Sequence, residues 1–308
     1  MQRHFHWTGL TDADRGASVA MGNFDGVHLG HQAVIGQAQR PGTPLGIVTF
    51  EPHPRQFFAP GAPAFRLMNA EARTHRLEKL GVDQLYELPF DAVLSGMTAE
   101  EFVREVLVNG LGVSHVTVGA DFCFGKGRKG DVDTLRRAGA GYGFGVTIAE
   151  LVAFEGVEVS STAIRMALAE GRPGDASKML GHWHRIEGEV LHGDKRGRDL
   201  GFPTANMGVG GLHLPKLGVY AVKVDILTGP HQGSYDGAAS LGVRPMFGEN
   251  KPNLESFLFD FEGSLYGEHL SVALIDYLRP EMTFDGLDAL VAQMHADCDR
   301  ARGILAQL

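Results

Sequence analysis

The sequence predicts an α/β domain followed by a small β-barrel, on the strength of three observations. Up to about residue 180, short apolar strands alternate with amphipathic helices, a pattern typical of a Rossmann-like, doubly wound parallel sheet. From Arg185 to Leu278, strand-like stretches and turns follow one another without a convincing helix, which indicates a small barrel. A long stretch of apolar residues at helical spacing, about Leu287 to Leu305, then predicts a C-terminal helix.

The expected elements follow from local patterns of apolar residues and helix-capping signals. The strands of the first half are predicted at Ser18–Met21, Leu45–Phe50, Gln84–Leu88, His115–Val118 and Val146–Ile148. Its helices are predicted at Leu29–Arg40, Ala72–Leu80, Thr98–Val108, Val132–Ala138, Thr162–Glu170 and Pro173–Leu180, the third opening on a capping box of Thr98 and Glu101. The clearest strands of the second half are Arg185–Val190, Gly218–Val224, Glu255–Phe259 and Ser271–Ile275, and Asp285 marks the start of the last helix. We therefore expect domains at residues 1–182 and 183–308.

Length and composition fit a two-domain globular protein of a reducing compartment. The chain has 308 residues, 44% of them hydrophobic and 21% charged, so disorder is not expected. No apolar run approaches the roughly 20 residues that span a bilayer, and the N-terminus lacks the apolar stretch of a signal peptide. Cys123 and Cys298 lie far apart in the sequence, so a disulfide framework is not indicated and a cytoplasmic location is expected.

The net charge of −9 disfavours nucleic acid and anionic membranes as partners. Two basic patches in glycine-rich surroundings stand against this background: Lys126, Arg128, Lys129, Arg136 and Arg137, and then Lys195, Arg196 and Arg198. Each patch is either a solvated charged loop or a site for a small anion, where glycine lets backbone N–H groups approach a phosphate. We expect small-molecule partners only; the oligomeric state is left open, and a monomer is compatible with the sequence.

A glycine-rich segment follows the first predicted strand and opens the first helix, reading GNFDGVHLGH from Gly22 to His31. Unpaired N–H groups at a helix N-terminus attract phosphate. His28 and His31 are three positions apart and can both face one polyphosphate, with Gly30 leaving room for a nucleotide between them. The alternatives are a zinc site, for which no nearby Cys, Asp or Glu repeats at ligand spacing, and surface histidines without a role. The segment is not a P-loop.

The first half resembles the nucleotidylyltransferase superfamily, in the version found in bacterial FAD synthetases. Four segments carry the resemblance in order: GNFDGVHLGH at Gly22–His31, TFEPHP at Thr49–Pro54, VGADFCFGKG at Val118–Gly127 and VSSTAIR at Val159–Arg165. The resemblance implies that FMN is adenylylated by ATP with release of pyrophosphate, and that His28 and His31 are catalytic. Ala120 and Cys123 depart from the family pattern, which often has an acidic and a polar or basic residue there.

The same resemblance assigns ligand-binding residues. Those expected to bind ATP are Gly22, Asn23, Phe24, Asp25, His28, His31, Asp121, Ser161, Thr162 and Arg165. Those expected to line an apolar wall for the flavin are Pro52, Pro54, Phe58 and Phe124, for which ordinary packing is the alternative.

A second motif, at Gly201–Asn206, reads GFPTAN and follows the basic loop Gly193–Arg198. Thr204 and Asn206 lie on the same side of an extended chain and offer hard oxygen ligands of the kind that Mg²⁺ prefers. The alternative is a turn in which both side chains only bond backbone groups.

The second half resembles the riboflavin kinase family, whose hallmark is GFPTAN. Later segments agree in order, among them LGVRPMF at Leu241–Phe247, Leu254–Glu255 and LRPE at Leu278–Glu281. The resemblance implies Glu255 as the general base for the ribityl hydroxyl, Thr204 and Asn206 as Mg²⁺ ligands, and Arg279 as a flavin contact. It implies ATP contacts at Gly193, Lys195, Arg198 and Gly201. Ser256 and Phe257 depart from the family pattern.

Together the two halves predict a bifunctional transferase that phosphorylates riboflavin to FMN and adenylylates FMN to FAD. ATP, riboflavin, FMN and FAD are its expected substrates and products, with Mg²⁺ as cofactor. Two alternatives stay open: a riboflavin kinase with an impaired adenylyltransferase module, motivated by Ala120 and Cys123, and a flavin-binding protein without turnover.

Overall fold

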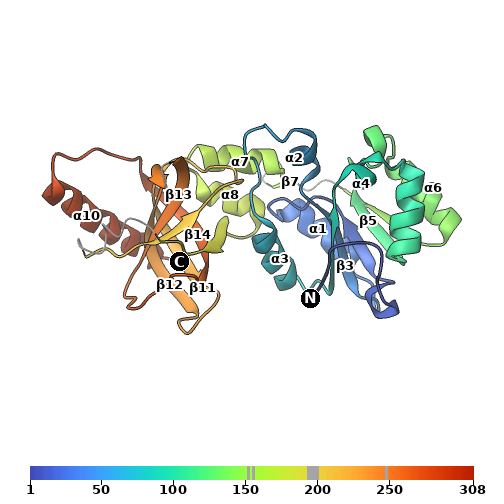
Figure 1. Cartoon of the computed structure of the whole chain (residues 1–308), viewed down its shortest axis with the longest axis horizontal. Coiled ribbons are helices and arrows are strands. Elements are labelled where there is room, and N and C mark those ends of the chain that lie inside the picture. Colours follow the sequence, from blue (N-terminus) through green and yellow to red (C-terminus); the bar gives the residue numbers. More distant parts are fainter. Residues whose placement is uncertain (151–152, 155–156, 193–200, 247–248) are drawn as a thin grey trace. The chain divides into compact units, whose positions relative to one another are not determined.

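The computed structural model describes residues 1–150, 153–154, 157–192, 201–246 and 249–308 (Figure 1). The chain divides into two compact units. Unit 1 comprises Met1–Pro63 and Arg73–Val159, and unit 2 comprises Ala64–Ala72 and Ser160–Leu308. The expected domain boundary between residues 182 and 183 stays a prediction, because compact units follow packing and need not coincide with domains defined by sequence. No helix in the described ranges is long and apolar enough to cross a membrane.

Unit 1 contains a six-stranded sheet in which every pairing is parallel. The strand order is β1-β4-β3-β2-β5-β6. The strands are β1 (Gln2–His4), β2 (Ser18–Met21), β3 (Leu45–Glu51), β4 (Gln84–Pro89), β5 (His115–Gly119) and β6 (Gly145–Ala149). The predicted parallel sheet is thus confirmed. The edge strand β1 was not predicted, since three residues with two polar ends carry no periodic signal.

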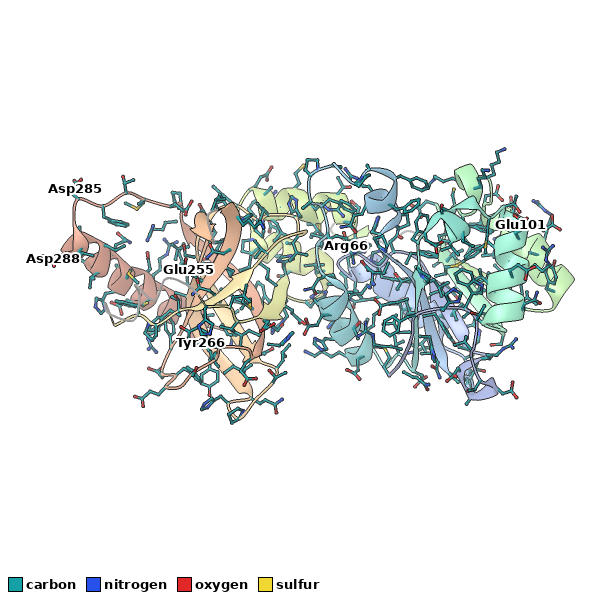
Figure 2. All side chains as sticks on the ribbon, viewed as in Figure 1. Arg66, Glu101, Glu255, Tyr266, Asp285 and Asp288 are labelled. Atoms are coloured by element: carbon teal, nitrogen blue, oxygen red, sulfur yellow. The ribbon has the colours of Figure 1, made fainter. Side chains whose placement is uncertain are left out.

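The helices of the first half connect these strands. They are η1 (Asp12–Asp14), α1 (Leu29–Ala38), α2 (Pro54–Phe58), α3 (Ala70–Lys79), α4 (Ala92–Gly96), α5 (Ala99–Glu101), η2 (Phe102–Gly110), η3 (Lys126–Arg128) and α6 (Val132–Tyr142). The predicted capping box is confirmed, because the Glu101 amide donates to Thr98 Oγ1 at 3.2 Å and the Thr98 amide donates to Glu101 Oε2 at 2.8 Å (Figure 2). The helix that it opens continues as the π-helix η2.

Helices cover both faces of the parallel sheet, which makes it doubly wound. One face packs on η2 in a core that includes Val19, Met21, Val116, Val118, Phe102 and Val106. The other face meets α1, where Ser18 Oγ donates to the Ala38 carbonyl at 2.5 Å. Because β2 is buried along its whole length, the loop that follows it leaves the sheet from a rigid base.

Unit 2 contains a six-stranded antiparallel sheet in the order β10-β13-β12-β11-β14-β9. Its strands are β9 (Arg185–Glu189), β10 (Ala205–Gly208), β11 (Gly218–Ile226), β12 (Gly233–Met246), β13 (Glu249–Leu258) and β14 (His269–Arg279). A bridge between Leu191 and Asn206 links the chain after β9 to β10, so the sheet nearly closes into the predicted barrel. A separate two-stranded sheet pairs β7 (Ala153–Phe154) with β8 (Val157–Glu158).

Within the described residues, unit 2 also contains the helices α7 (Ser161–Ala169), α8 (Pro173–Leu180) and α10 (Leu287–Leu305). The barrel interior holds one apolar core, and a second apolar cluster joins α10 to the outer face of the barrel. The bounds predicted for α10 are confirmed, but Asp285 does not cap it. The N-cap is Gly286, whose backbone makes the turn into the helix without any side-chain cap, and Asp285 precedes it (Figure 2).

Candidate active sites

The phosphate segment of unit 1 lies where the strand order of the parallel sheet reverses. β2 and β5 are neighbours although two strands separate them in the sequence. The segment Gly22–His31 leaves the carboxyl end of β2, and Asp121 follows the carboxyl end of β5. Ligands of doubly wound sheets bind in the crevice outside such a point, because the connections on either side diverge there. The two predicted nucleotide segments therefore meet at one edge of the sheet.

The two histidines of this segment stack face to face. Their ring centroids are 3.6 Å apart and the ring planes differ by 16°. His28 is the N-cap of α1, and its Nδ1 accepts a hydrogen bond from the His31 amide at 3.3 Å. Because Nδ1 accepts, the neutral His28 ring carries its proton on Nε2, which makes Nε2 a donor suited to phosphate. Burial, and then the neighbouring His28, lower the pKa of His31 well below its usual value.

Gly30 has a different role from the one expected. A Cβ at this position would lie 3.1 Å from Cε1 and Nδ1 of His28. The missing side chain therefore makes room for the His28 ring, and the interval that was expected to receive a nucleotide is closed by stacked imidazoles. Glycine suits position 30 for a steric reason. The His28 imidazole folds back over the first turn of the helix and occupies the space that a Cβ would need.

The loop between β2 and α1 is held in an uncommon backbone conformation. Phe24 and Val27 have φ angles of 50° and 43°, and both side chains are buried. Non-glycine residues adopt positive φ at some energetic cost, and such positions concentrate at ligand clamps. Asp25 is buried, whereas Asn23 is exposed. Among Gly22–Asp25, all expected to bind ATP, Asn23 is thus the residue whose exposed side chain is best placed to contact a ligand that enters from solvent.

The loop after β5 folds back on itself. A Cβ on Gly119 would lie 3.1 Å from Asp121 Oδ1, so the Asp121 carboxylate stands over the end of the strand. Cys123 Sγ donates to the Asp121 carbonyl at 3.7 Å. Phe124 is buried and packs on Phe102 at a centroid distance of 5.7 Å, as a core side chain does. Its expected part in the flavin wall stays a prediction.

An aromatic group lies beyond the carboxyl ends of β3 and β4. Phe58, in α2, is 68% exposed, and its ring stands edge to face with Phe57 at 5.2 Å and with Phe90 at 5.7 Å. Phe57 and Phe90 also contact each other at 5.5 Å. Sequence reasoning singled out Phe58 but missed Phe57 and Phe90. The available signal was that Phe90 directly follows the end of β4, at the ligand edge of the sheet.

Ser161, Thr162 and Arg165 stand in the first turns of α7, in unit 2. Ser160 is the N-cap and its Oγ accepts from the Ala163 amide at 3.2 Å. Arg165 Nε donates to the Phe65 carbonyl at 2.6 Å, and the guanidinium lies over the Phe65 ring. The helix start thus has the expected form, and its role in binding ATP stays a prediction.

The barrel pairs the predicted metal ligand with the predicted base. Asn206 on β10 stands directly opposite Glu255 on β13. Side chains directly opposite in an antiparallel pair point to the same face of the sheet, about 5 Å apart at Cβ. Asn206 Nδ2 donates to the Thr204 carbonyl at 3.3 Å. The amide nitrogen is thus used within the chain, and the amide oxygen Oδ1 is the end that faces other partners.

The face that carries Glu255 is the outer face of the barrel, which α10 partly covers. Phe257, two residues after Glu255, contacts Phe202 at 5.2 Å, and Phe202 in turn contacts His295 of α10 at 5.0 Å. This apolar group closes one side of the surface that displays Asn206 and Glu255. It also gives a structural use to Phe257, which departs from the family pattern.

Arg279 is engaged in a structural contact. Its Nη2 and Nε bind the buried Asp297 carboxylate of α10 at 2.7 and 3.0 Å, and its Nη1 donates to the Pro280 carbonyl at 2.9 Å. The contact fastens α10 to the end of β14. A flavin contact for Arg279 stays a prediction.

Gly193, Lys195 and Arg198 lie outside the described residues. Gly201 is described and has a φ of 84°, a left-handed turn conformation that favours glycine. His192 stacks on Tyr266 of the barrel at a centroid distance of 4.0 Å (Figure 2).

Comparisons with known proteins match both halves. The FAD synthetase family model matches residues 10–163, and the riboflavin kinase family model matches residues 180–305. The bifunctional riboflavin kinase/FMN adenylyltransferase of Pseudomonas fluorescens is 44% identical over 303 residues, covering 96% of each chain. That of Escherichia coli K12 is 39% identical over 286 residues, covering 92% of this chain and 90% of its own.

A crystal structure from Streptococcus pneumoniae, described there as a macrolide-efflux protein, shares the fold. It is 30% identical, has a TM-score of 0.81 and covers 98% of each chain. Family models match both halves of the chain, and the relatives are matched over nearly their whole length. The chain belongs to the family of bifunctional riboflavin kinase/FMN adenylyltransferases.

Proposed function

We propose that the stacked pair His28 and His31 is the phosphate-handling centre of FMN adenylylation. An FMN phosphate oxygen attacks the α-phosphorus of ATP, the bond to the β-phosphate oxygen breaks, and pyrophosphate leaves with the bonding electrons. The attacking group is already an anion, so no strong base is needed and positioning dominates catalysis. The His28 tautomer supports this role, because a proton on Nε2 can be donated to phosphate oxygens as negative charge develops on them.

The exposed ring of Phe58 is proposed to contact the flavin of FMN. The ring is exposed at the ligand edge of the sheet and is held there by Phe57 and Phe90. Pro52 and Pro54, which precede it, are proposed to complete the wall. A flat aromatic ligand gains from stacking on a ring that its neighbours already hold in place.

For the second activity we propose that Glu255 takes the proton of the riboflavin ribityl hydroxyl as that oxygen attacks the γ-phosphorus of ATP, with ADP leaving. The observation that carries this is the cross-strand pair of Asn206 and Glu255. Thr204 and Asn206 would hold Mg²⁺, and their hydroxyl and amide oxygens are ligands of the hard type that fits this ion. When bound, Mg²⁺ would supply charge neutralisation at the ATP phosphates.

A product assay with separated nucleotides tests both assignments. Wild-type protein with ATP, Mg²⁺ and riboflavin should yield FMN and then FAD. His31→Ala should stop the sequence at FMN, whereas Glu255→Gln should block riboflavin phosphorylation and still adenylylate added FMN. Equal loss of both activities in both variants contradicts the two-site assignment. Accumulation of FMN by the wild type would favour a kinase with an impaired adenylyltransferase, and flavin binding without ATP consumption would favour a binding protein.

A further inference from the structure

A buried asparagine lies beside Glu255 on the same face of β13. Strand alternation puts Asn253 and Glu255 on one side of the sheet, since they are two residues apart in a regular ladder. Asn253 Nδ2 donates a hydrogen bond to Glu255 Oε1 at 3.2 Å. The Asn253 side chain is only 4% exposed, whereas Glu255 is partly exposed. The bond therefore runs from the buried sheet to the carboxylate at its surface.

The surroundings of Asn253 differ from those of an ordinary residue in a sheet, which packs against side chains of the neighbouring strands. Its cross-strand neighbours are Gly208 on β10 and Gly242 on β12, so neither adjoining strand offers it a side chain at that level. The place of a side chain at position 242 is taken by Glu281, because a Cβ there would collide with Glu281 Oε1. Asn253 thus lies beside the Glu255 carboxylate and opposite a glycine over which the Glu281 carboxylate lies.

The amide orientation follows from its neighbours. A carboxylate oxygen can only accept, so the end of Asn253 that faces Glu255 must be Nδ2. The opposite end, Oδ1, is buried and has no hydrogen-bond partner among the described residues. The hydrogen bond to Glu255 is therefore the side-chain contact that fixes the orientation of this amide.

We propose that Asn253 is a positioning residue for Glu255 in riboflavin phosphorylation. It restrains the carboxylate through Oε1 and places a neutral donor beside it. This inference rests on the proposed role of Glu255 as general base. A general base must be correctly oriented at the moment when the hydroxyl loses its proton. A hydrogen bond that holds the Glu255 side chain in one rotamer increases the fraction of molecules in which the carboxylate has this orientation.

Two variants test this role. Asn253→Ala removes the donor, and kcat for riboflavin phosphorylation should fall roughly 10- to 100-fold, with KM changed by less than about twofold. Asn253→Asp keeps the shape but replaces the amide donor with an acceptor, so it should lose kcat to a similar degree with KM again nearly unchanged.

A matched control exists in unit 1. Asn109 Nδ2 donates to Glu105 Oε2, also at 3.2 Å, but this pair is exposed on η2. Asn109→Asp makes the same chemical change beside a carboxylate and should leave kcat and KM for riboflavin phosphorylation unchanged. FMN adenylylation and thermal unfolding, measured on every variant, report whether the chain is folded.

The outcomes distinguish this inference from the proposed function. If Glu255→Gln abolishes phosphorylation while both Asn253 variants keep the wild-type kcat, Asn253 has no positioning role and the function of Glu255 stands. If Glu255→Gln keeps full activity, the base assignment fails and the inference with it. A lower unfolding temperature with unchanged kcat per folded molecule assigns Asn253 to the sheet alone and overturns the inference.

Discussion

At the level of single residues, the proposed adenylyltransferase site depends on the absence of a side chain at Gly30. The rings of His28 and His31 can stack at 3.6 Å only because position 30 has no Cβ beneath the His28 ring. The same fold-back brings His28 Nδ1 to the His31 amide and so selects the tautomer with Nε2 protonated. Sterics at one glycine therefore decide which nitrogen is presented to a phosphate.

Gly30→Ala should impair FMN adenylylation without weakening the protein. The new Cβ would lie 3.1 Å from two His28 ring atoms, so the ring must shift and the stacked pair must open. We expect kcat/KM for FMN adenylylation to fall roughly 10- to 100-fold, as displaced catalytic groups do. Alanine is a better helix former than glycine by up to about 1 kcal/mol, so lost stability would not explain the effect.

Gly36→Ala is the matched control for Gly30→Ala, because it lies in the same helix and a Cβ there would have no atom within 4 Å. It should keep full adenylylation, and both variants should keep riboflavin phosphorylation. Wild-type adenylylation by Gly30→Ala would show that the stacked arrangement is not needed for the reaction.

Motifs allowed some site residues to be predicted and left others hidden. His28, His31, Thr204 and Asn206 stand in segments whose spacing itself suggests phosphate or cation chemistry. Asn253 stands in no such segment. Its position follows from three strands in register, with glycines on both neighbours, and a register cannot be read from one strand alone.

At the level of elements, the segment Ala64–Ala72 is part of unit 2 because side chains of the barrel region hold it. His184 Nε2 donates to the Leu67 carbonyl at 2.9 Å, and Asn69 Nδ2 donates to the Glu187 carbonyl at 2.9 Å. His184 is buried, and its Nδ1 has no partner within the described ranges. Burial lowers the pKa of His184 from 6.5 to about 4.

This histidine should make unit 2 less stable in acid. Because its folded pKa is lowered, the unfolded state takes up the proton first, so stability is intact above about pH 6.5 and is lost as the pH falls towards about 4. A shift of this size corresponds to a loss on the order of 3 kcal/mol. His184→Gln, with a neutral amide donor, should unfold in thermal melts with a shallower dependence on pH between 7 and 4.

The control for His184→Gln is His6→Gln, which changes an exposed histidine of unit 1 and should leave the dependence as in the wild type. Parallel melting curves for His184→Gln and the wild type across this pH range would contradict the assignment of the acid sensitivity to His184.

Helices and apolar strands were predictable because each carries its own periodic signal. The predicted bounds of α8 and α10 agree with the structure. β12 was not predicted, because its run GSYDGAASLGVRPM is rich in small residues and has only Tyr235 and Val243 of the aromatic and β-branched kinds that mark strands. It forms because β11 and β13 pair with it on both sides, which is tertiary information.

At the level of the whole molecule, each activity has a core of its own. The cluster that supports β2 and β5 lies in unit 1, and the cluster inside the barrel lies in unit 2. The fold class of each half was predictable because the change from alternating strands and helices to strands alone is visible along the chain. How α7 and α8 would pack was not, since their cluster includes Leu67 from far earlier in the sequence.

Separate cores imply that two defective proteins should complement each other. His31→Ala keeps the proposed kinase site and Glu255→Gln keeps the proposed adenylyltransferase site, so an equimolar mixture with riboflavin, ATP and Mg²⁺ should form FAD. FMN must leave one molecule and bind another, so FAD should appear after a lag that shortens as protein concentration rises. Chromatography of flavins over time measures this, and the double variant His31→Ala with Glu255→Gln, added at the same total concentration, should form none. The contrary outcome is a mixture that accumulates FMN without FAD, although Glu255→Gln alone adenylylates added FMN. FMN made by one molecule would then not reach another, and both reactions would have to take place within a single chain.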